Sequence, residues 1–568
     1  MSDAFTIDGI SVTDRQIIAI RFNKFYVNIG PSLEKNIPVT QTDPEEYLDI
    51  PNMNSIFLAS TDELEVSKII KNLKISSPGW DNVSSKVVKN AYQYFVRPLV
   101  HILNISLMNG HVPRELKIAR VMPIFKSGDK KIISNYRPVS VLPCFSKILE
   151  KLVYKRMINF ITKYDILYKY QFGFREKHGT SLALSFLIDN IVSAHEKGQC
   201  VLGIFIDFSK AFDTVNHQIL YKKLANYGIR GMALNWIKSY LSDRTQFVEF
   251  QGVKSGNENI TCGVPQGSIL GPLLFLLYVN DIVKASQEVL TILFADDTNI
   301  FKAGTNIDMM ISSMNNELDN IVKWLQANKL SLNVKKTHYI IFKPGRTSVS
   351  PTSNIRINNQ IVQQEMSTTF LGVVLDSKLS WGLHVQKIKM KMSKSIGIIS
   401  KARKILNRKT LLTLYYSFIY PYMSYCVEVW GNAAKTYTDS LLKLQKLCCR
   451  IITGSKRLTP SEPLFRCLKI LKLPDIYEYS VMLFMFKFYN GLLPQTMSTL
   501  FQQMDSTKTM VTRQRHNLLL PCYKSLTACN SIRFQGSKIW NKYHKEFNLQ
   551  CSYFTFKHHF KMFILNRY

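Results

Sequence analysis

The chain has 568 residues, of which 73 are Lys or Arg and 40 are Asp or Glu, giving a formal net charge of +33. With 46% apolar and 12% aromatic residues it can bury a sizeable core, which excludes a disordered or collagen-like chain. This charge favours a polyanionic partner such as a nucleic acid, with an anionic membrane surface as the alternative. The ten cysteines include no C-x-x-C pair, so the sequence predicts neither a disulfide framework nor a zinc ribbon.

No apolar run is long enough to cross a membrane. The most apolar one, residues 269–279, contains Gly271 and Pro272 and is shorter than the about 20 residues that a spanning helix needs. The first residues, up to Asp14, lack the apolar core of a secretory signal. We therefore expect an intracellular protein that is not anchored in a membrane.

The predicted elements begin after residues 1–60, which contain four scattered prolines and are interpreted as a lead-in segment. Apolar residues recur at helical spacing over 61–73, and this predicts a capped amphipathic helix that stops before Pro78. A second amphipathic helix follows Pro143, with its apolar face over 148–158.

In the middle of the chain the pattern changes to strands. Residues 201–206 form an apolar run that ends at Asp207. Residues 290–301 contain two short apolar runs, which predict a β-hairpin with Ala295, Asp296 and Asp297 at or beside its tip.

The later elements mix helix and strand again. A helix is predicted over 314–325 and a strand over 337–342, so the core is of the α+β or α/β type with non-local pairing. Residues 384–410 hold nine Lys or Arg and no acidic residue beside one apolar stripe, which predicts a basic amphipathic helix. That helix is a solvated face, a membrane-surface helix or a nucleic-acid-binding helix, and the aromatic residues that follow it favour nucleic acid.

Carboxylates at the ends of two predicted strands are the first candidates for a functional site. If the strands lie side by side, Asp207 and the pair Asp296 and Asp297 form an oxygen-rich site suited to Mg²⁺. Neighbouring residues of a strand face opposite ways, so one member of the pair ligates directly, and we select Asp296. The alternative is structural, with Asp207 as a turn cap and the pair as a polar hairpin tip.

Seven short motifs occur in a fixed order along the chain. Together they resemble the palm of reverse transcriptases, specifically those of non-LTR (LINE-like, jockey-like) retrotransposons, over about residues 60–430. The motifs are Lys126-Ser127-Gly128-Asp129, Asn135-Tyr136-Arg137-Pro138-Val139-Ser140, Gln171-Phe172-Gly173-Phe174-Arg175, Asp207-Phe208-Ser209-Lys210-Ala211-Phe212-Asp213, Gly263-Val264-Pro265-Gln266-Gly267-Ser268, Phe294-Ala295-Asp296-Asp297 and Phe370-Leu371-Gly372-Val373.

The resemblance implies an α+β right-hand polymerase with a mostly helical C-terminal extension. It also implies that residues 1–60 follow an endonuclease domain that this chain lacks. The expected parts are fingers over 61–200, palm over 201–380, thumb over 381–435 and a basic extension over 436–568, with the reverse transcriptase domain overall at about 105–378.

The resemblance also implies a metal site. Asp207 and Asp296 would hold two Mg²⁺ ions, for which Mn²⁺ is a substitute, with Asp297 in support and the Phe208 carbonyl as an extra ligand.

The remaining roles concern the nucleotide. Lys126 and Arg137 would meet the triphosphate of the incoming nucleotide. Phe212 would exclude a sugar with a 2′-hydroxyl, although it could equally be one more buried Phe. Lys336, with its neighbour Lys335 as the alternative, would protonate the departing pyrophosphate. Three more residues complete the substrate site, namely Gln266, Gly267 and Ala295.

The implied function is RNA-directed DNA polymerase activity. Its partners would be an RNA template, a DNA primer or target DNA, and dNTPs, with no membrane and with an undetermined oligomeric state. The nucleus is the expected compartment and the cytoplasm the alternative. The rival functions are an RNA-directed RNA polymerase and a catalytically silent, retrotransposon-derived RNA-binding protein. An organellar intron maturase is a closer relative of the expected class but fits the long tail less well.

Overall fold

A computed structural model describes residues 4–7, 9–345, 351–503 and 517–568. The helices up to residue 327 are α1 Arg15–Lys35, α2 Glu63–Lys71, α3 Ser85–Asn109, α4 Cys144–Lys163, α5 Thr180–Glu196, α6 His217–Asn226, α7 Gly231–Leu241, α8 Leu270–Val279 and α9 Ile307–Ala327. The later helices are α10 Gly382–Ala402, α11 Arg408–Phe418, α12 Tyr420–Ser424, α13 Val427–Trp430, α14 Lys435–Thr453, α15 Glu462–Leu468, α16 Leu473–Tyr489, α17 Leu526–Cys529, α18 Ile532–Tyr543 and α19 Tyr553–Leu565.

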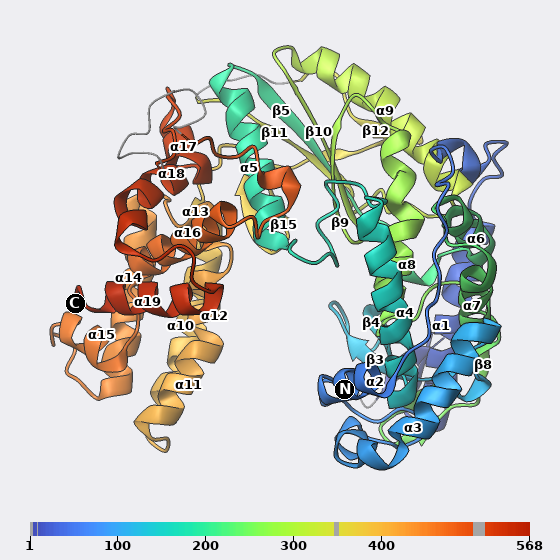
Figure 1. Ribbon diagram of the computed structural model, residues 1–568. Helices are drawn as coiled ribbons and strands as arrows, with labels where there is room; N and C mark the ends of the chain where they lie inside the picture. The colour runs from blue at the N-terminus through green and yellow to red at the C-terminus, as the bar shows by residue number, and fades with distance from the viewer. Residues whose placement is uncertain (1–3, 8, 346–350, 504–516) are drawn as a thin grey trace.

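Among the described residues the strands lie between 5 and 376, so the fold is mixed α and β in its first part and helical afterwards. In Figure 1, α10–α19 gather on one side of the view and α1–α4 with α6–α8 on the other, with α5 and a sheet above and between them. The strands are β1 Phe5–Ile7, β2 Ile10–Val12, β3 Ile118–Phe125, β4 Tyr136–Val141, β5 Cys200–Ile206, β6 Arg244–Phe250, β7 Val253–Lys254, β8 Glu258–Ile260, β9 Leu290–Phe294, β10 Asp297–Gly304, β11 His338–Phe342, β12 Arg356–Ile357, β13 Gln360–Ile361, β14 Gln363–Gln364, β15 Ser367–Phe370 and β16 Val373–Asp376.

Most predicted elements are present, with shifted ends. Helix α2 is capped by Asp62, whose carboxylate accepts the Glu65 N–H at 2.7 Å, so the helix begins slightly later than predicted. The predicted basic helix over 384–410 is two helices, because α10 ends at Ala402 and a new helix starts after Asn407. The Asn407 side chain accepts the Thr410 N–H at 2.9 Å and thereby caps α11.

The central sheet has the strand order β14-β11-β5-β10-β9. Strand β5 lies between two antiparallel neighbours, since Ile206 is opposite Thr298 of β10 and Val201 is opposite Phe342 of β11. Strands β9 and β10 form the predicted hairpin. The end of β5 therefore lies beside the hairpin tip.

Side chains of β5 alternate between two hydrophobic cores, as the period of a strand requires. Leu202 and Ile204 pack in the core that contains α8 and α9. Val201 and Phe205 pack in the core that contains α5 and the later helices. Every residue of β5 is buried, which fixes its register and hence the position of the residue that follows it.

A second sheet has the order β4-β3-β6-β7, with β8 also paired to β6. Strand β3 runs antiparallel to β4 and parallel to β6. Helix α1 covers this sheet through a small core in which Phe22 meets the Tyr136 ring edge-on at 5.3 Å. The N-terminal segment is thus packed onto the main body.

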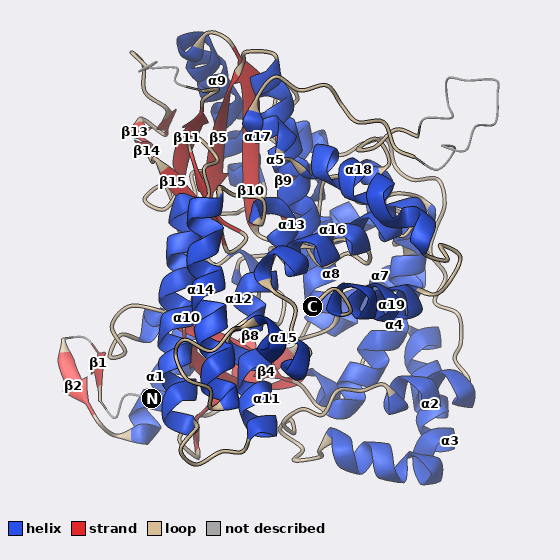
Figure 2. Ribbon diagram, turned by 90° about the vertical axis from the view of Figure 1, so that its left-hand side faces the viewer, coloured by secondary structure: helices blue, strands red, loops and turns tan. Residues whose placement is uncertain are grey.

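The C-terminal helices are tied back to α5. Arg533 of α18 donates two hydrogen bonds, of 2.9 and 2.6 Å, to the carboxylate of Asp189. The Glu196 carboxylate accepts the backbone N–H groups of Lys524 and Ser525. Helices α10 and α14 lie side by side below the central sheet (Figure 2).

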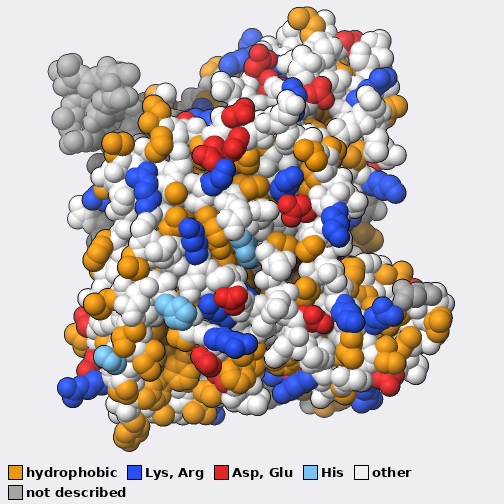
Figure 3. All heavy atoms as spheres, turned by 90° about the vertical axis from the view of Figure 1, so that its right-hand side faces the viewer, with side chains coloured by type: hydrophobic (Ala, Val, Ile, Leu, Met, Phe, Trp, Pro, Cys, Tyr) orange, Lys and Arg blue, Asp and Glu red, His pale blue; other side chains and the backbone are white. Residues whose placement is uncertain are grey.

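One face of the molecule carries basic, acidic and apolar side chains (Figure 3). In Figure 3, basic groups are interspersed with acidic ones, and apolar side chains gather at its lower end. Helix α3 lies at that height in Figure 1 and exposes Val87, Tyr94 and Met108. Within the described residues, no helix is both long and apolar enough to span a membrane.

Candidate active site

Three carboxylates meet at one end of the central sheet. Asp207 directly follows β5, and Asp297 is the first residue of β10. Since Ile206 pairs with Thr298, the antiparallel register brings Asp207 beside Asp297. Asp296 lies at the hairpin tip after Ala295, which is buried and has a left-handed φ of +57°. The strand pairing therefore brings the three predicted aspartates together.

A neighbouring segment holds the hairpin tip in place. The buried side-chain oxygen of Gln171 accepts the N–H groups of Gly173 at 2.8 Å and Ala295 at 3.1 Å. The Phe172 N–H donates to the Leu293 carbonyl at 2.8 Å. Gln171 belongs to one of the seven sequence motifs, but no role was predicted for it.

The pKa values of Asp296 and Asp297 are raised by burial and by the neighbouring carboxylates. Burial by surrounding protein raises the pKa of Asp296, and the charge of Asp207 raises it further. Burial, then the charges of Asp296 and Asp207, raise the pKa of Asp297 to about 6. Both side chains of the pair still reach solvent, so the site is open to a ligand. Such a cluster gains stability from a cation.

Three basic residues, Lys126, Arg137 and Lys336, face this cluster, and Lys210 lies close to them. The Lys336 ammonium lies 3.8 Å from an Asp207 carboxylate oxygen. Burial lowers the pKa of Lys126, and the positive charges of Arg137 and Lys336 lower it further. Burial also lowers the pKa of Lys210, in part against the charge of Asp213, and Lys126 and Arg137 lower it further. Lys210 was missed as a site residue, although it belongs to the motif that begins at Asp207.

Phe212 and Gln266 lie on adjoining segments. The Phe212 ring is half-buried and stacks on Phe275 with centroids 4.3 Å apart, while exposed Phe174 meets it edge-on at 6.4 Å. Gln266 donates a side-chain hydrogen bond of 2.8 Å to Asp213, the residue after Phe212.

Gly267 and Phe208 lie in backbone segments that pack beside the site. A Cβ at Gly267, where φ is +123°, would collide with the Ser140 carbonyl oxygen, so the loop lies close against β4. Phe208 is buried and forms an isolated bridge with Leu332.

Sequence comparison decides the class of this site. Residues 125–375 match the model of a family described as "Reverse transcriptase (RNA-dependent DNA polymerase)". The three aspartates and the four basic residues all lie within this range. These residues form a reverse transcriptase domain.

The chain that carries this reverse transcriptase domain has curated relatives from mobile elements. It is 29% identical over 444 residues to "RNA-directed DNA polymerase from mobile element jockey" of Drosophila melanogaster, which covers 76% of this chain and 48% of the relative. It is 25% identical to "Probable RNA-directed DNA polymerase from transposon X-element" of the same species, covering 79% and 48%. It is 28% identical to the jockey polymerase of Drosophila funebris, covering 72% and 46%.

The chain spans about half the length of these curated relatives. The predicted resemblance to the reverse transcriptases of non-LTR retrotransposons is confirmed by the domain match and by the relatives' names.

The donor set of the reverse transcriptase domain fits a hard divalent cation. The three aspartates offer carboxylate oxygens, which Mg²⁺ prefers, and their mutual repulsion disfavours a site without a cation. In the described part of the chain, no group of three or more His, Cys, Asp or Glu side chains is arranged to hold a metal by itself. A bound Mg²⁺ would take further oxygens from substrate and water, as is usual for this ion.

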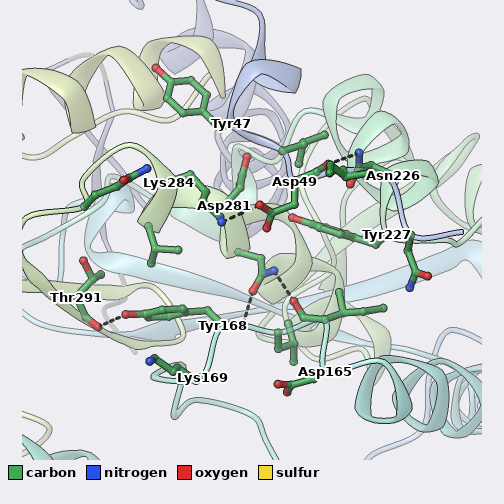
Figure 4. Close-up of a pocket in the computed structure, with 18 of the residues that line it drawn as sticks. Tyr47, Asp49, Asp165, Tyr168, Lys169, Asn226, Tyr227, Asp281, Lys284 and Thr291 are labelled. Carbon is green, nitrogen blue, oxygen red and sulfur yellow. Dashed lines mark hydrogen bonds and ion pairs between the residues drawn. The ribbon is translucent and has the colours of Figure 1, made fainter.

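A second hollow lies apart from the reverse transcriptase site. Its cavity of about 760 Å³ is lined by N-terminal residues such as Tyr47 and Asp49 together with Tyr168 and Tyr227 (Figure 4). Asp49 forms a 2.7 Å ion pair with Lys284 across it. None of the predicted site residues lines this cavity.

Proposed function

We propose that this chain is an RNA-directed DNA polymerase that adds dNTPs to a DNA primer on an RNA template. The observation that carries the proposal is the meeting of three carboxylates with Lys126, Arg137 and Lys336 at one end of the central sheet, within the reverse transcriptase domain. Carboxylates beside cations suit a reaction in which a hydroxyl attacks a triphosphate held by metal ions.

Asp207 and Asp296 are assigned to the metal ions, with Asp297 in support and the Phe208 carbonyl as an added ligand. When bound, Mg²⁺ supplies activation of the primer 3′-hydroxyl and neutralisation of charge on the phosphates. Mn²⁺ is the expected substitute. The protein's part is to hold the carboxylates at fixed positions, which the buried β5 strand and Gln171 support.

The basic residues are assigned to the triphosphate. Lys126 and Arg137 come from β3–β4, whereas Lys210 comes from the palm segment after Asp207. They would meet the phosphates from different sides, and the planar guanidinium of Arg137 suits paired phosphate oxygens. Lys336, which pairs with Asp207, is favoured over Lys335 as the donor to pyrophosphate.

Phe212 is assigned to sugar selection. Its ring is fixed by stacking on Phe275, so it cannot rotate freely away from a nucleotide above it. A 2′-hydroxyl at that position would meet the ring, which favours dNTPs over NTPs. Gln266, Gly267 and Ala295 are assigned to the surroundings of the base and sugar.

We assign the right-hand parts with the boundaries expected from the sequence. Fingers extend over 61–200, palm over 201–380, thumb over 381–435 and a basic extension over 436–568, after the lead-in 1–60. Strand β6 of the palm segment pairs with β3 of the fingers segment, so the two parts interleave. Exposed lysines of α10, such as Lys389, support its placement along the phosphates of the template and primer. Action on a chromosomal primer implies the nucleus.

The test is primer extension on an RNA template with dNTPs and Mg²⁺. Wild type should extend the primer, Asp296→Asn should not, and both should bind the primed RNA. Asp319→Asn, on the exposed side of α9, is the matched control and should extend as wild type does. If folded wild type binds primed RNA but adds no nucleotide with Mg²⁺ or Mn²⁺, the proposal fails, and the chain is a silent RNA-binding protein.

A further inference from the structure

Among the described residues, one hydrogen-bond partner orients the Gln266 carboxamide. Its backbone is fixed, because its carbonyl accepts the Ser140 N–H at 2.8 Å and the next residue, Gly267, lies against Ser140. Its side chain donates to Asp213 Oδ1 at 2.8 Å. The direction of the carboxamide, next to Phe212, therefore depends on Asp213.

Asp213 is itself only half satisfied. Its second oxygen, Oδ2, is buried and has no hydrogen-bond partner among the residues that the structure describes. Burial raises the pKa of Asp213 to about 6, with Gln266 acting against that rise. A buried carboxylate oxygen without a donor is costly, so a donor is expected there.

Two buried donors face the same small cavity. Tyr26 of α1 is 6% exposed, and its hydroxyl has no partner in the described part of the chain. Arg244 is 1% exposed, and its Nε and Nη2 are likewise unpartnered there. Asp213, Tyr26 and Arg244 line a cavity of about 40 Å³. At about 10–15 Å³ for each water, that volume admits about two to four bridging molecules.

Helix α1 is held close to this cavity. A Cβ at Gly30 would lie 2.6 Å from the Asp213 carbonyl oxygen and would collide with the Cys262 sulfur. Asn23 donates to the carbonyl oxygens of Gly256 at 2.9 Å and Gln246 at 3.3 Å. Helix α1 lies outside residues 125–375, so the domain match gives it no role.

We propose that Asp213, linked through buried water to Tyr26 of helix α1, is a positioning residue that aims the Gln266 carboxamide at the nucleotide. The proposal rests on the proposed polymerase function and adds to it. The N-terminal helix then contributes to nucleotide binding indirectly, through Asp213.

The test measures single-nucleotide incorporation. Asp213→Ala should raise KM for dNTP about tenfold with kcat within about twofold, because it removes a hydrogen bond to a charged group. Asp213→Asn keeps an acceptor for Gln266 and should rescue most of the loss. Equal losses in Asp213→Asn and Asp213→Ala, or a loss confined to kcat, would overturn the proposal.

A double-mutant cycle separates positioning from general destabilisation. In a Gln266→Ala background, Asp213→Ala should change KM by less than about twofold, since its action requires the carboxamide. Fully additive effects would contradict the proposal.

The link to α1 is tested with two tyrosines. Tyr26→Phe removes one buried hydroxyl and should raise KM about threefold. Tyr227→Phe removes a buried hydroxyl beside the cavity in Figure 4 and should leave KM unchanged. Equal effects of the two variants would contradict the role of α1.

If wild type extends no primer, the proposed function fails, and hydrogen exchange then decides this inference. The backbone amides within 263–268, apart from Pro265, should exchange faster in Asp213→Ala than in wild type, with exchange in α9 unchanged. Unchanged exchange in 263–268 would overturn the positioning role whatever the activity.

Discussion

Gly173 lies so close to Ala295 that a Cβ at position 173 would be 3.1 Å from the Ala295 Cα and would collide with its backbone nitrogen. This contact joins the segment after α4 to the hairpin tip that carries Asp296. The aspartates are therefore positioned by a loop as well as by their own strands.

Gly173→Ala should displace the hairpin tip. We expect primer extension to fall about 100-fold, because a shift of about 1 Å at a reacting centre costs that much, and stability to fall by about 1–3 kcal/mol. Extension rates and thermal unfolding measure the two effects. Gly179→Ala is the control, since no atom lies within 4 Å of a Cβ there. Wild-type activity of Gly173→Ala would show that the tip tolerates movement.

Phe212→Val should weaken discrimination between dNTPs and NTPs by roughly 10- to 100-fold, because a smaller side chain leaves room for a 2′-hydroxyl. The measurement is the ratio of kcat/KM for dNTP and NTP. Phe212→Tyr keeps the ring and should keep the discrimination. If the ratio is the same in Phe212→Val and wild type, another residue selects the sugar.

Asp297→Asn should stabilise the protein in a pH-dependent way. The pKa of Asp297 rises from 3.8 to about 6 on folding, so the folded state binds the extra proton and stability falls as pH rises through this window. Removing the charge should therefore raise Tm at pH 7.5 without Mg²⁺ and change it little at about pH 4. The difference in Tm between Asp297→Asn and wild type reports on Asp297, because Asp213, whose pKa is also raised, is present in both proteins.

Asp296→Asn reports on metal binding. Added Mg²⁺ should raise the Tm of wild type by relieving the repulsion among the aspartates, and it should raise the Tm of Asp296→Asn less. An equal rise in both proteins would place metal binding elsewhere.

Arg533→Ala should loosen the C-terminal helices from α5. It leaves the Asp189 carboxylate, which is 7% exposed, without its charged partner, at a cost of about 3–5 kcal/mol. Chemical unfolding and limited proteolysis near α18 are the measurements. Lys542→Ala breaks an exposed ion pair with Glu478 and should cost at most about 1 kcal/mol. Equal losses of stability in Arg533→Ala and Lys542→Ala would show that the ion pair of Arg533 and Asp189 stabilises the protein no more than a surface ion pair does.

The sequence alone indicated the class of the domain and predicted the three aspartates that the fold brings together. The sequence predicted a strand that ends at Asp207 and a hairpin around Asp296 and Asp297. These elements could be predicted because apolar alternation and turn residues are local signals. The order of seven motifs then indicated a reverse transcriptase, which the domain match confirms.

Only the tertiary structure decided which distant segments meet. Neither Gln171 nor Lys210 stood out, because hydrogen bonds and charges between segments leave no periodic trace in a sequence. The break after Ala402 was missed because Asn407 interrupts a pattern that stays basic on both sides. The packing of α1 beside Asp213 depends on the second sheet, where β3 pairs with β6 across a long stretch of chain. Such pairings are fixed by burial and register in the folded chain, not by neighbouring residues.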